Sequence, residues 1–352
     1  MNPTRISKIE ANSAVATALL ALVTVTSFAA PVFAADGMVN VYSYRKEALI
    51  KPQLDAFTAA SGIRVNLVTG KADALLERLK SEGRNSPADI LLTTDIGRMV
   101  RARDAGVLKS VKSAALTSSI PAKYRDPEGH WFGLSVRARI IFYAPDRVKS
   151  SELSTYEDLT QAKWKDRICI RSSSNVYNQS LLASMIKHNG ALKAESWAKG
   201  MVANFARKPQ GGDRDQIRAV AAGECDVAVA NTYYYAAMGS GKKKSDRTAA
   251  AKVKPFWPNQ AGRGAHVNIS GGAVTASAKN TENAIKLLEF LASADAQRLY
   301  ADVVNEYPVR AGVPVSDAVK AMGDFKADGI VLAEVAKHQA DAIRMFDRVG
   351  WR

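Results

Sequence analysis

Cysteine and histidine are scarce in this chain, and their scarcity excludes several kinds of site. Only 2 cysteines occur in 352 residues, too few for a disulfide-rich scaffold or a four-cysteine zinc site. The 4 histidines are scattered: His130, His188, His266 and His338. Their spacing argues against a metal site built from histidine. No Ser-His-Asp arrangement or catalytic carboxylate pair is visible either, so the sequence favours a binding protein over an enzyme.

Long hydrophobic runs are also absent after the first 35 residues, so no later segment could span a bilayer. At the start, Arg5 precedes an apolar run over Ala14–Ala30, and small residues lead up to Ala34 and Ala35. This order is typical of a secretory signal peptide, and a run of about 17 residues is short for a membrane anchor. We expect residues 1–34 to be a leader cut after Ala34 or Ala35, which predicts a periplasmic protein without stable membrane insertion.

The chain carries an excess of positive charge, with 49 Lys and Arg against 34 Asp and Glu and a formal net charge of +15. An intracellular protein with this charge would suggest a nucleic-acid partner. An exported protein meets an anionic ligand or a membrane surface instead, so we expect no nucleic acid. Gly241-Lys242 resembles the end of a phosphate-binding loop, but the spacing of that motif fails here.

The two cysteines each begin an apolar run that resembles a strand. Cys169 lies in Ile168-Cys169-Ile170, and Cys225 precedes Asp226-Val227-Ala228-Val229. Neighbouring strands of one sheet could bring the two sulfurs within bonding range, and an exported compartment is oxidising. We therefore predict a Cys169–Cys225 disulfide; the alternative is two buried free thiols.

Short strand-like runs alternate with helical segments along most of the chain. We expect strands at 39–44, 63–68, 88–93, 134–143, 167–171, 225–230, 252–256 and 269–276. We expect helices at 49–60, 72–82, 284–292, 294–303 and 331–349. The order strand–helix–strand predicts an α/β fold with a largely parallel sheet covered by helices. An exported α/β protein with two lobes is, by analogy of fold, a solute-binding protein.

A run of tyrosines is the most distinctive chemical feature. Tyr233, Tyr234 and Tyr235 follow a predicted strand and the cap-like pair Asn231-Thr232, and Tyr177 similarly follows the strand 167–171. Ligands of open α/β sheets bind at the carboxyl ends of strands. A phenolate oxygen is a hard donor suited to Fe(III), which would displace the phenol proton on binding. The alternative is that one or two of these rings belong to the core.

Two arginines of another predicted strand could hold an anion. Arg137 and Arg139 alternate with apolar residues and so point to the same face. Paired guanidinium groups could bind a carbonate-sized anion through several hydrogen bonds. The alternative is a pair of surface salt bridges.

Several segments together resemble the periplasmic ferric-ion-binding proteins of bacterial ABC importers. They are Tyr42-Ser43-Tyr44-Arg45, 85–90 (NSPADI), 137–141 (RARII), 211–216 (GGDRDQ), 231–234 (NTYY) and 268–271 (NISG). The matches span nearly the whole chain after the leader, in order and spacing. The segments 211–216 and 231–234 are specific, whereas 85–90 is shared with other solute-binding proteins.

The resemblance implies a two-lobed, transferrin-like trap for Fe(III) that delivers iron to an inner-membrane ABC permease and works as a monomer. The paired tyrosines of the family match Tyr233 and Tyr234, and the third matches Tyr177. We expect these three phenolates to bind Fe(III). Carbonate or water would complete the shell, held by Arg137 and Arg139.

The chain departs from some family members after its first strand. Those members place a His-Tyr pair where this chain has Lys46 and Glu47, so Tyr44 and Glu47 are only substitute ligands. A competing hypothesis is a binding protein for an inorganic anion, such as phosphate, or for a small organic solute. A hydrolase on the same fold is a third hypothesis, and it lacks a visible nucleophile–base motif.

The resemblance also implies a type II periplasmic-binding-protein fold with two hinge strands and a cleft between its lobes. We expect the N-terminal lobe to comprise 36–137 and 265–313. The C-terminal lobe would comprise 138–264 and 314–352. Asp213 and Asp215, within the segment 211–216, are predicted to cap a helix and to form structural ion pairs.

Overall fold

A mixed sheet of eight strands runs through the protein, of which the computed structural model describes residues 37–352. The strands are β1 (Met38–Ser43), β2 (Arg64–Thr69), β3 (Ile90–Thr94), β4 (Phe132–Tyr143), β5 (Ile168–Cys169), β6 (Val227–Asn231), β7 (Lys254–Phe256) and β8 (Val267–Val274). Their order is β2-β1-β3-β8-β4-β6-β5, with β7 also paired to β4. The predicted signal peptide lies outside the described residues.

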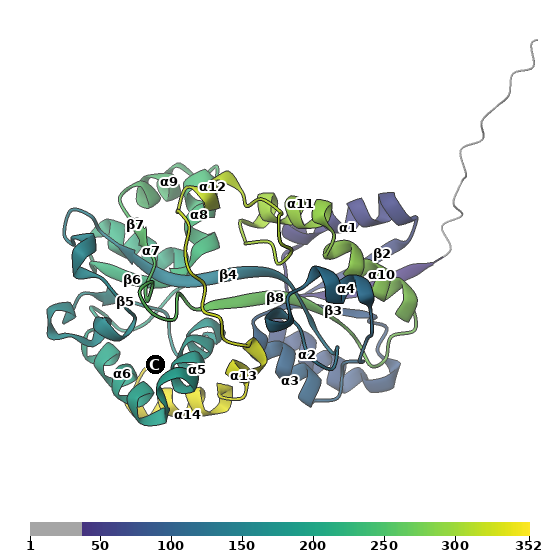
Figure 1. Cartoon of the computed structure of the whole chain (residues 1–352), viewed down its shortest axis with the longest axis horizontal. Helices are drawn as coiled ribbons and strands as arrows, with labels where there is room; N and C mark the ends of the chain where they lie inside the picture. The colour runs from purple at the N-terminus through teal and green to yellow at the C-terminus, as the bar shows by residue number, and fades with distance from the viewer. Residues whose placement is uncertain (1–36) are drawn as a thin grey trace, which may run out of the picture. The chain divides into compact units, whose positions relative to one another are not determined.

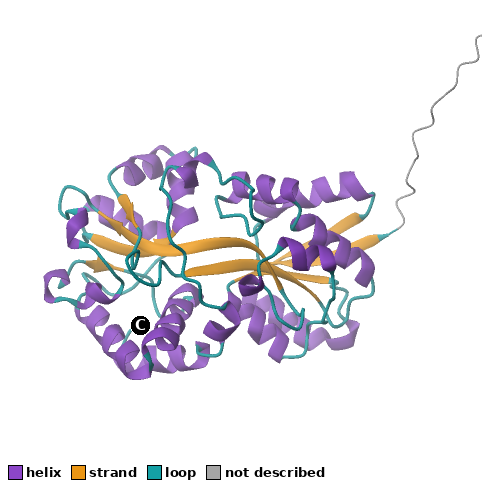
Figure 2. Ribbon diagram, in the orientation of Figure 1, coloured by secondary structure: helices purple, strands orange, loops and turns teal. Residues whose placement is uncertain are grey.

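Helices cover both faces of this sheet (Figures 1 and 2). They are α1 (Glu47–Ser61), α2 (Ala72–Glu82), α3 (Ile96–Asp104), α4 (Ala114–Ser119), α5 (Val176–Asn189), α6 (Ala191–Ala203), α7 (Asp213–Ala222), α8 (Thr232–Ser240), α9 (Lys244–Ala251), α10 (Thr281–Leu291), α11 (Ala294–Val304), α12 (Asp317–Lys320), α13 (Leu332–Ala336) and α14 (Gln339–Val349). The predicted strands and helices are present within a few residues, except that β5 has only two residues and the helix predicted at 331–349 is divided in two. No helix in the described part of the chain is long and apolar enough to cross a membrane.

The prediction of a largely parallel sheet is wrong. Pairs β1–β2, β1–β3 and β5–β6 are parallel, whereas β8 is antiparallel to β3 and β4, and β4 is antiparallel to β6 and β7. The alternation of strands and helices describes local connections only. The long strands β4 and β8 pair with partners far away in sequence, and their direction follows from those partners.

Strand β4 connects the two parts of the sheet. Its first half, up to Ala138, pairs with β8, and its second half, from Arg139 to Tyr143, pairs with β6. All twelve residues of β4 are buried, because helices cover both of its faces. At Gly271 of β8 a Cβ atom would lie 2.5 Å from the backbone oxygen of Phe132. The paired strands β4 and β8 therefore approach too closely here for any residue but glycine. The long paired strands β4 and β8 agree with the prediction of two hinge strands. The predicted lobe boundaries remain a prediction.

The C-terminal helical segment differs from its prediction. One helix was expected over 331–349, but α13 ends at Ala336 and α14 begins at Gln339. The apolar pattern continues across the break, which is why the sequence suggested one helix. Both helices pack against α5, but α13 also packs against α3 and α14 also packs against α6. Tertiary packing therefore divides the segment.

The predicted disulfide joins Cys169 to Cys225, with their Cα atoms 5.9 Å apart. Both cysteines are buried. Cys169 ends β5, which is held to β6 by only two residue pairs, Ile168 with Val227 and Cys169 with Ala228. The bond therefore reinforces a short strand whose continuation leads to Tyr177.

Removing this disulfide is expected to destabilise the protein by about 4 kcal/mol, because it closes a loop with a sequence separation of 56 residues. The test is urea unfolding of a variant in which Cys169 and Cys225 are both replaced by alanine. Its free energy of unfolding should fall by this amount relative to the oxidised wild type. An unchanged unfolding midpoint would contradict the prediction.

Candidate metal centre

Three predicted tyrosines meet at the starts of two helices. Tyr177 is the second residue of α5, and Tyr233 and Tyr234 are the second and third residues of α8. The strands before these helices, β5 and β6, are parallel, so their carboxyl ends lie at the same edge of the sheet. The hydroxyl oxygens of Tyr177 and Tyr233 are 3.3 Å apart, and the ring centroids of Tyr233 and Tyr234 are 4.1 Å apart.

The third member of the tyrosine run points elsewhere. The hydroxyl of Tyr235 donates to the backbone oxygen of Val253 at 2.9 Å. Its ring packs against Phe142 with centroids 5.0 Å apart. Successive helical residues diverge by about 100°, so three adjacent side chains cannot share one face. The pair Tyr233 and Tyr234 is therefore separate from Tyr235.

Burial favours the protonated phenols of Tyr233 and Tyr234 in the absence of a metal. It raises the pKa of Tyr233 well above its ordinary value, and the neighbouring phenols of Tyr177 and Tyr234 add to the effect. The pKa of Tyr234 is raised by burial and then by Tyr177, while the nearby Arg171 opposes the shift. A ligand that binds the phenolate forms must therefore displace protons.

Of the two substitute ligands, only Tyr44 interacts electrostatically with the tyrosine cluster in the described part of the chain. Tyr44 follows β1 and is half-buried. Burial, and then the phenol of Tyr177, raise its pKa, and the Arg98 guanidinium lies 5.0 Å from its ring centroid. Glu47, the first residue of α1, is exposed, and its carboxylate makes no hydrogen bond or ion pair with the described residues. Tyr44 is thus the better placed of the two.

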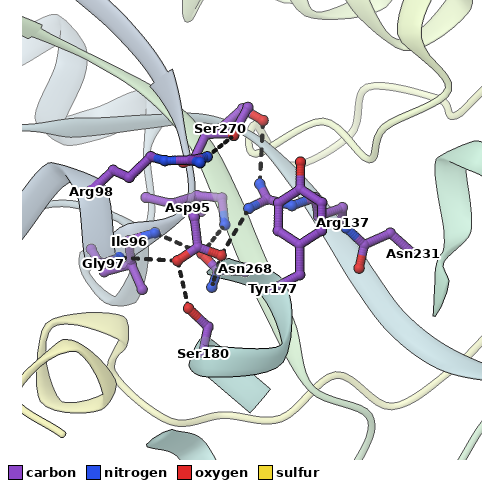
Figure 3. Close-up of polar contacts among 12 residues, drawn as sticks. Asp95, Ile96, Gly97, Arg98, Arg137, Tyr177, Ser180, Asn231, Asn268 and Ser270 are labelled. Carbon is purple, nitrogen blue, oxygen red and sulfur yellow. Dashed lines mark hydrogen bonds and ion pairs between the residues drawn. The ribbon is translucent and has the colours of Figure 1, made fainter. Parts of the chain in front are cut away.

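The arginines Arg137 and Arg139 are ion-paired, but both are buried, so they are not a surface pair. Arg137 contacts Asp95 and Ser270, each at 3.3 Å, and lies 5.1 Å from the ring centroid of Tyr177 (Figure 3). Arg139 pairs with Asp213 at 2.9 Å. The two guanidinium groups therefore have different surroundings.

The predicted structural roles of Asp213 and Asp215 are confirmed. Asp213 begins α7, is buried, and pairs with Arg139 and also with Arg171 at 3.0 Å. Asp215 accepts from the backbone N–H of Gly212 at 2.7 Å and so caps the same helix. Both carboxylates are engaged within the protein.

A family model described as bacterial extracellular solute-binding protein matches residues 85–326. The chain belongs to this family. The match covers more than half of the chain and includes the tyrosine cluster. It confirms the prediction of a solute-binding protein and excludes the hydrolase hypothesis.

Relatives of this solute-binding protein agree with the predicted resemblance. The chain is 48% identical over 314 residues to Iron uptake protein A1 of Synechocystis sp. The alignment covers 89% of this chain and 87% of that protein. A structure from Trichodesmium (IdiA, FutA) in complex with iron and citrate is 52% identical, with a TM-score of 0.87 over 90% of this chain and 100% of that one. The ferric binding protein from Campylobacter jejuni is 41% identical, with a TM-score of 0.85 over 89% and 100%. The two-lobed α/β fold is thereby confirmed.

Asp95 lies beside the candidate site of this solute-binding protein, although no sequence motif identified it as a site residue. It caps α3 with a positive φ of 80° and accepts from the backbone N–H of Gly97 at 3.1 Å. Its carboxylate also accepts from Arg137, Asn268 and Ser180 (Figure 3). An aspartate between a strand and a helix is a cap signal, and that signal could have identified it.

Arg45 and Glu306 form a buried ion pair that no sequence signal connects, since 261 residues separate them. Glu306 also accepts hydrogen bonds from Ser135 and Ser270. The Arg45 guanidinium lies near Tyr233 and opposes the rise in its pKa. The pair is neutral overall, and the Glu306 carboxylate raises the pKa of Tyr233 while Arg45 lowers it.

One further group of potential ligands lies in the turn before β4. Asp126, Glu128 and His130 have donor atoms within 4.8 Å of one another. Asp126 is already engaged, because it accepts from the backbone N–H of His130 at 3.1 Å and lies 3.5 Å from Arg103. The tyrosine cluster remains the candidate metal centre.

Proposed function

We propose that this protein is an exported ferric-ion-binding protein that captures Fe(III) through Tyr177, Tyr233 and Tyr234. The observation that carries the proposal is the cluster of buried phenols, with the Tyr177 and Tyr233 oxygens 3.3 Å apart. Two hydroxyl oxygens at this distance can converge on one cation. Phenolate oxygens are hard ligands that suit a small trivalent ion. The iron-related names of the relatives support the same cargo.

The free donors of a buried arginine support an anion beside the iron. Three phenolates neutralise Fe(III), and a bound carbonate would leave the centre negative. The guanidinium groups of Arg45, Arg98 and Arg171 act on the tyrosines, but each is paired with a carboxylate, so their charges are largely balanced. Arg137 lies 5.1 Å from the ring centroid of Tyr177. Among the described residues it makes two hydrogen bonds, each 3.3 Å long, and so keeps donor capacity for carbonate.

Citrate is a second candidate for the anion. The similar Trichodesmium structure contains both iron and citrate. Citrate could enter as part of a ferric complex and occupy the positions that carbonate would fill. The experiment below therefore separates the two anions.

The proposed cargo implies a place in transport. We propose that the protein acts in the periplasm after removal of residues 1–34. It would deliver iron as a monomer to an inner-membrane ABC permease. Membership in the extracellular solute-binding family supports this role.

A visible absorption titration tests the proposal. Charge transfer from phenolate to Fe(III) produces a broad visible band, so the purified protein should turn red to orange with one equivalent of iron. Iron is supplied as ferric citrate, or as ferric nitrilotriacetate with and without bicarbonate. A band that needs bicarbonate when citrate is absent would assign carbonate as the anion. A band that forms only with ferric citrate would assign citrate.

The control is a variant with Tyr177, Tyr233 and Tyr234 all replaced by phenylalanine, which keeps the rings and removes the oxygens. This variant should stay colourless under every condition. A wild type that remains colourless at one equivalent of iron would refute the ferric proposal. It would then favour an inorganic anion or a small organic solute as the ligand.

A further inference from the structure

Arg139 lies at the point where β4 leaves β8 and joins β6. Its backbone N–H donates to His266, just before β8, at 3.0 Å, and its Cα is paired with Asn231 at the end of β6. The side chain is only 2% exposed. Arg139 is therefore buried at the position where β4 changes its pairing partner from β8 to β6.

The guanidinium of Arg139 connects both helices that carry the tyrosines. Nη2 donates to Oδ1 of Asn178 at 2.6 Å, and Asn178 directly follows Tyr177 on α5. Nη1 donates to Oδ1 of Asn231 at 3.1 Å, and Asn231 directly precedes α8. One rigid, planar group thus binds a residue beside Tyr177 and a residue two positions before Tyr233.

The same guanidinium is neutralised where it connects these helices. Nη1 also pairs with Asp213 at 2.9 Å, at the start of α7, and Nη2 donates to the backbone oxygen of Val229 at 3.2 Å. The side chain of Asn231 makes no capping hydrogen bond to α8, because its Oδ1 accepts from Arg139 instead. Both Nη atoms therefore have their partners inside the protein.

The remaining nitrogen, Nε, has no hydrogen-bond partner among the described residues, and Arg139 lines a small cavity. Nε of Arg139, Nδ2 of Asn231 and Nδ1 of His266 are buried and find no hydrogen-bond partner among the described residues. All three residues line one cavity together with Tyr177, Arg137, Asp95 and Asn268, and the centre of a water molecule has about 10 Å³ to occupy there. That space is about enough for a single water. A carbonate ion is too large for it.

We infer that Arg139 is a positioning residue, which holds the two tyrosine-bearing helices at a fixed spacing, and that one buried water completes its hydrogen bonds. The inference rests on the proposed binding of Fe(III) by these tyrosines. It assigns different roles to the two arginines of β4: Arg137 has donors for the anion, and Arg139 sets the spacing of the phenolates. Lysine could not replace Arg139, because a single ammonium cannot reproduce the planar fork.

Arg139→Lys tests this role, with Arg147→Lys as the matched control. Arg147 also carries structural contacts, to Asp226 at 2.6 Å and to the backbone oxygen of Val220 at 2.7 Å, but it binds no residue beside the tyrosines. We expect Arg139→Lys to weaken Fe(III) binding roughly 10- to 100-fold and to shift the visible band. The loss should be the same with and without bicarbonate. Arg147→Lys should keep the wild-type band and affinity.

Two results with Arg139→Lys would overturn the inference. One is wild-type affinity with an unshifted band. The other is a loss of affinity only in the presence of bicarbonate, which would make Arg139 a ligand of the anion. A wild type without any band refutes the proposed function itself, so the two failures can be told apart.

A second variant covers the case in which Arg139→Lys does not fold. Asn231→Ala removes one acceptor for Arg139 Nη1 and loses no other side-chain hydrogen bond to the described residues, since Nδ2 has no partner there. We expect Asn231→Ala to bind Fe(III) about tenfold more weakly, while Arg147→Lys again keeps the wild-type affinity. Wild-type affinity in Asn231→Ala would refute the positioning role.

The buried water has its own test. A crystal structure at high resolution should show one ordered water within hydrogen-bond distance of Arg139 Nε, Asn231 Nδ2 and His266 Nδ1. An empty cavity, or a larger anion in it, would refute that part of the inference.

Discussion

Tyr233→Phe is expected to weaken Fe(III) binding more than 100-fold and to remove most of the visible band. Tyr233 lies at the centre of the cluster, because its hydroxyl contacts that of Tyr177 and its ring packs on Tyr234. Loss of a residue that only supports a metal ligand costs about 10- to 100-fold in affinity, and loss of a ligand should cost more. Competition with a chelator of known affinity measures the change.

Tyr235→Phe is the matched control for this substitution. Tyr235 is in the same helix, two residues further on, and its hydroxyl bonds to Val253 away from the cluster. It should bind iron as the wild type does. Equal losses in the two variants would show that the tyrosine run supports the fold of α8 and does not bind the metal directly.

Iron affinity is expected to fall steeply as the pH falls. Burial raises the pKa values of Tyr233 and Tyr234 above the ordinary value of about 10, so these phenols are protonated throughout the neutral range. Each phenolate that binds iron must first release a proton. The affinity for the free ion should therefore fall about tenfold per pH unit for each ligating tyrosine, or roughly a million-fold from pH 7.5 to 5.5 for three.

Two measurements check this dependence. Titration with iron in weakly buffered solution should release one proton for each tyrosine that binds. Tyr177→Phe should lower that number by one and make the pH dependence correspondingly shallower. An affinity that does not change with pH would mean that neutral groups, and not phenolates, hold the metal.

Local patterns predicted the elements well where local sequence determines them. The helix α2 has its predicted bounds, 72–82, because an amphipathic run is followed directly by Gly83 with a positive φ. The placement of Tyr177, Tyr233 and Tyr234 at helix starts after strands was also predicted correctly. Cap residues and strand ends are adjacent in the chain, so the sequence displays them directly.

Contacts between distant segments could not be predicted in this way. Arg137 and Arg139 alternate with apolar residues, and the pattern correctly places both on the same strand. Their partners, Asp95 and Asp213, come from other parts of the chain and give each arginine a different environment. The buried pair of Arg45 with Glu306 is equally invisible, because charged residues show no sequence signal for burial.

The sequence by itself determined the α/β class, the tyrosines that meet at one edge of the sheet and the two cysteines that bond. These features depend on the periodicity of side chains and on the parallel run of β5 beside β6. Only the tertiary structure decided the antiparallel course of β4 and β8, the break before α14 and the burial of Arg139 between the tyrosine-bearing helices. Each of these depends on which distant groups satisfy hydrogen bonds and charges once water is excluded, and no local pattern records that choice.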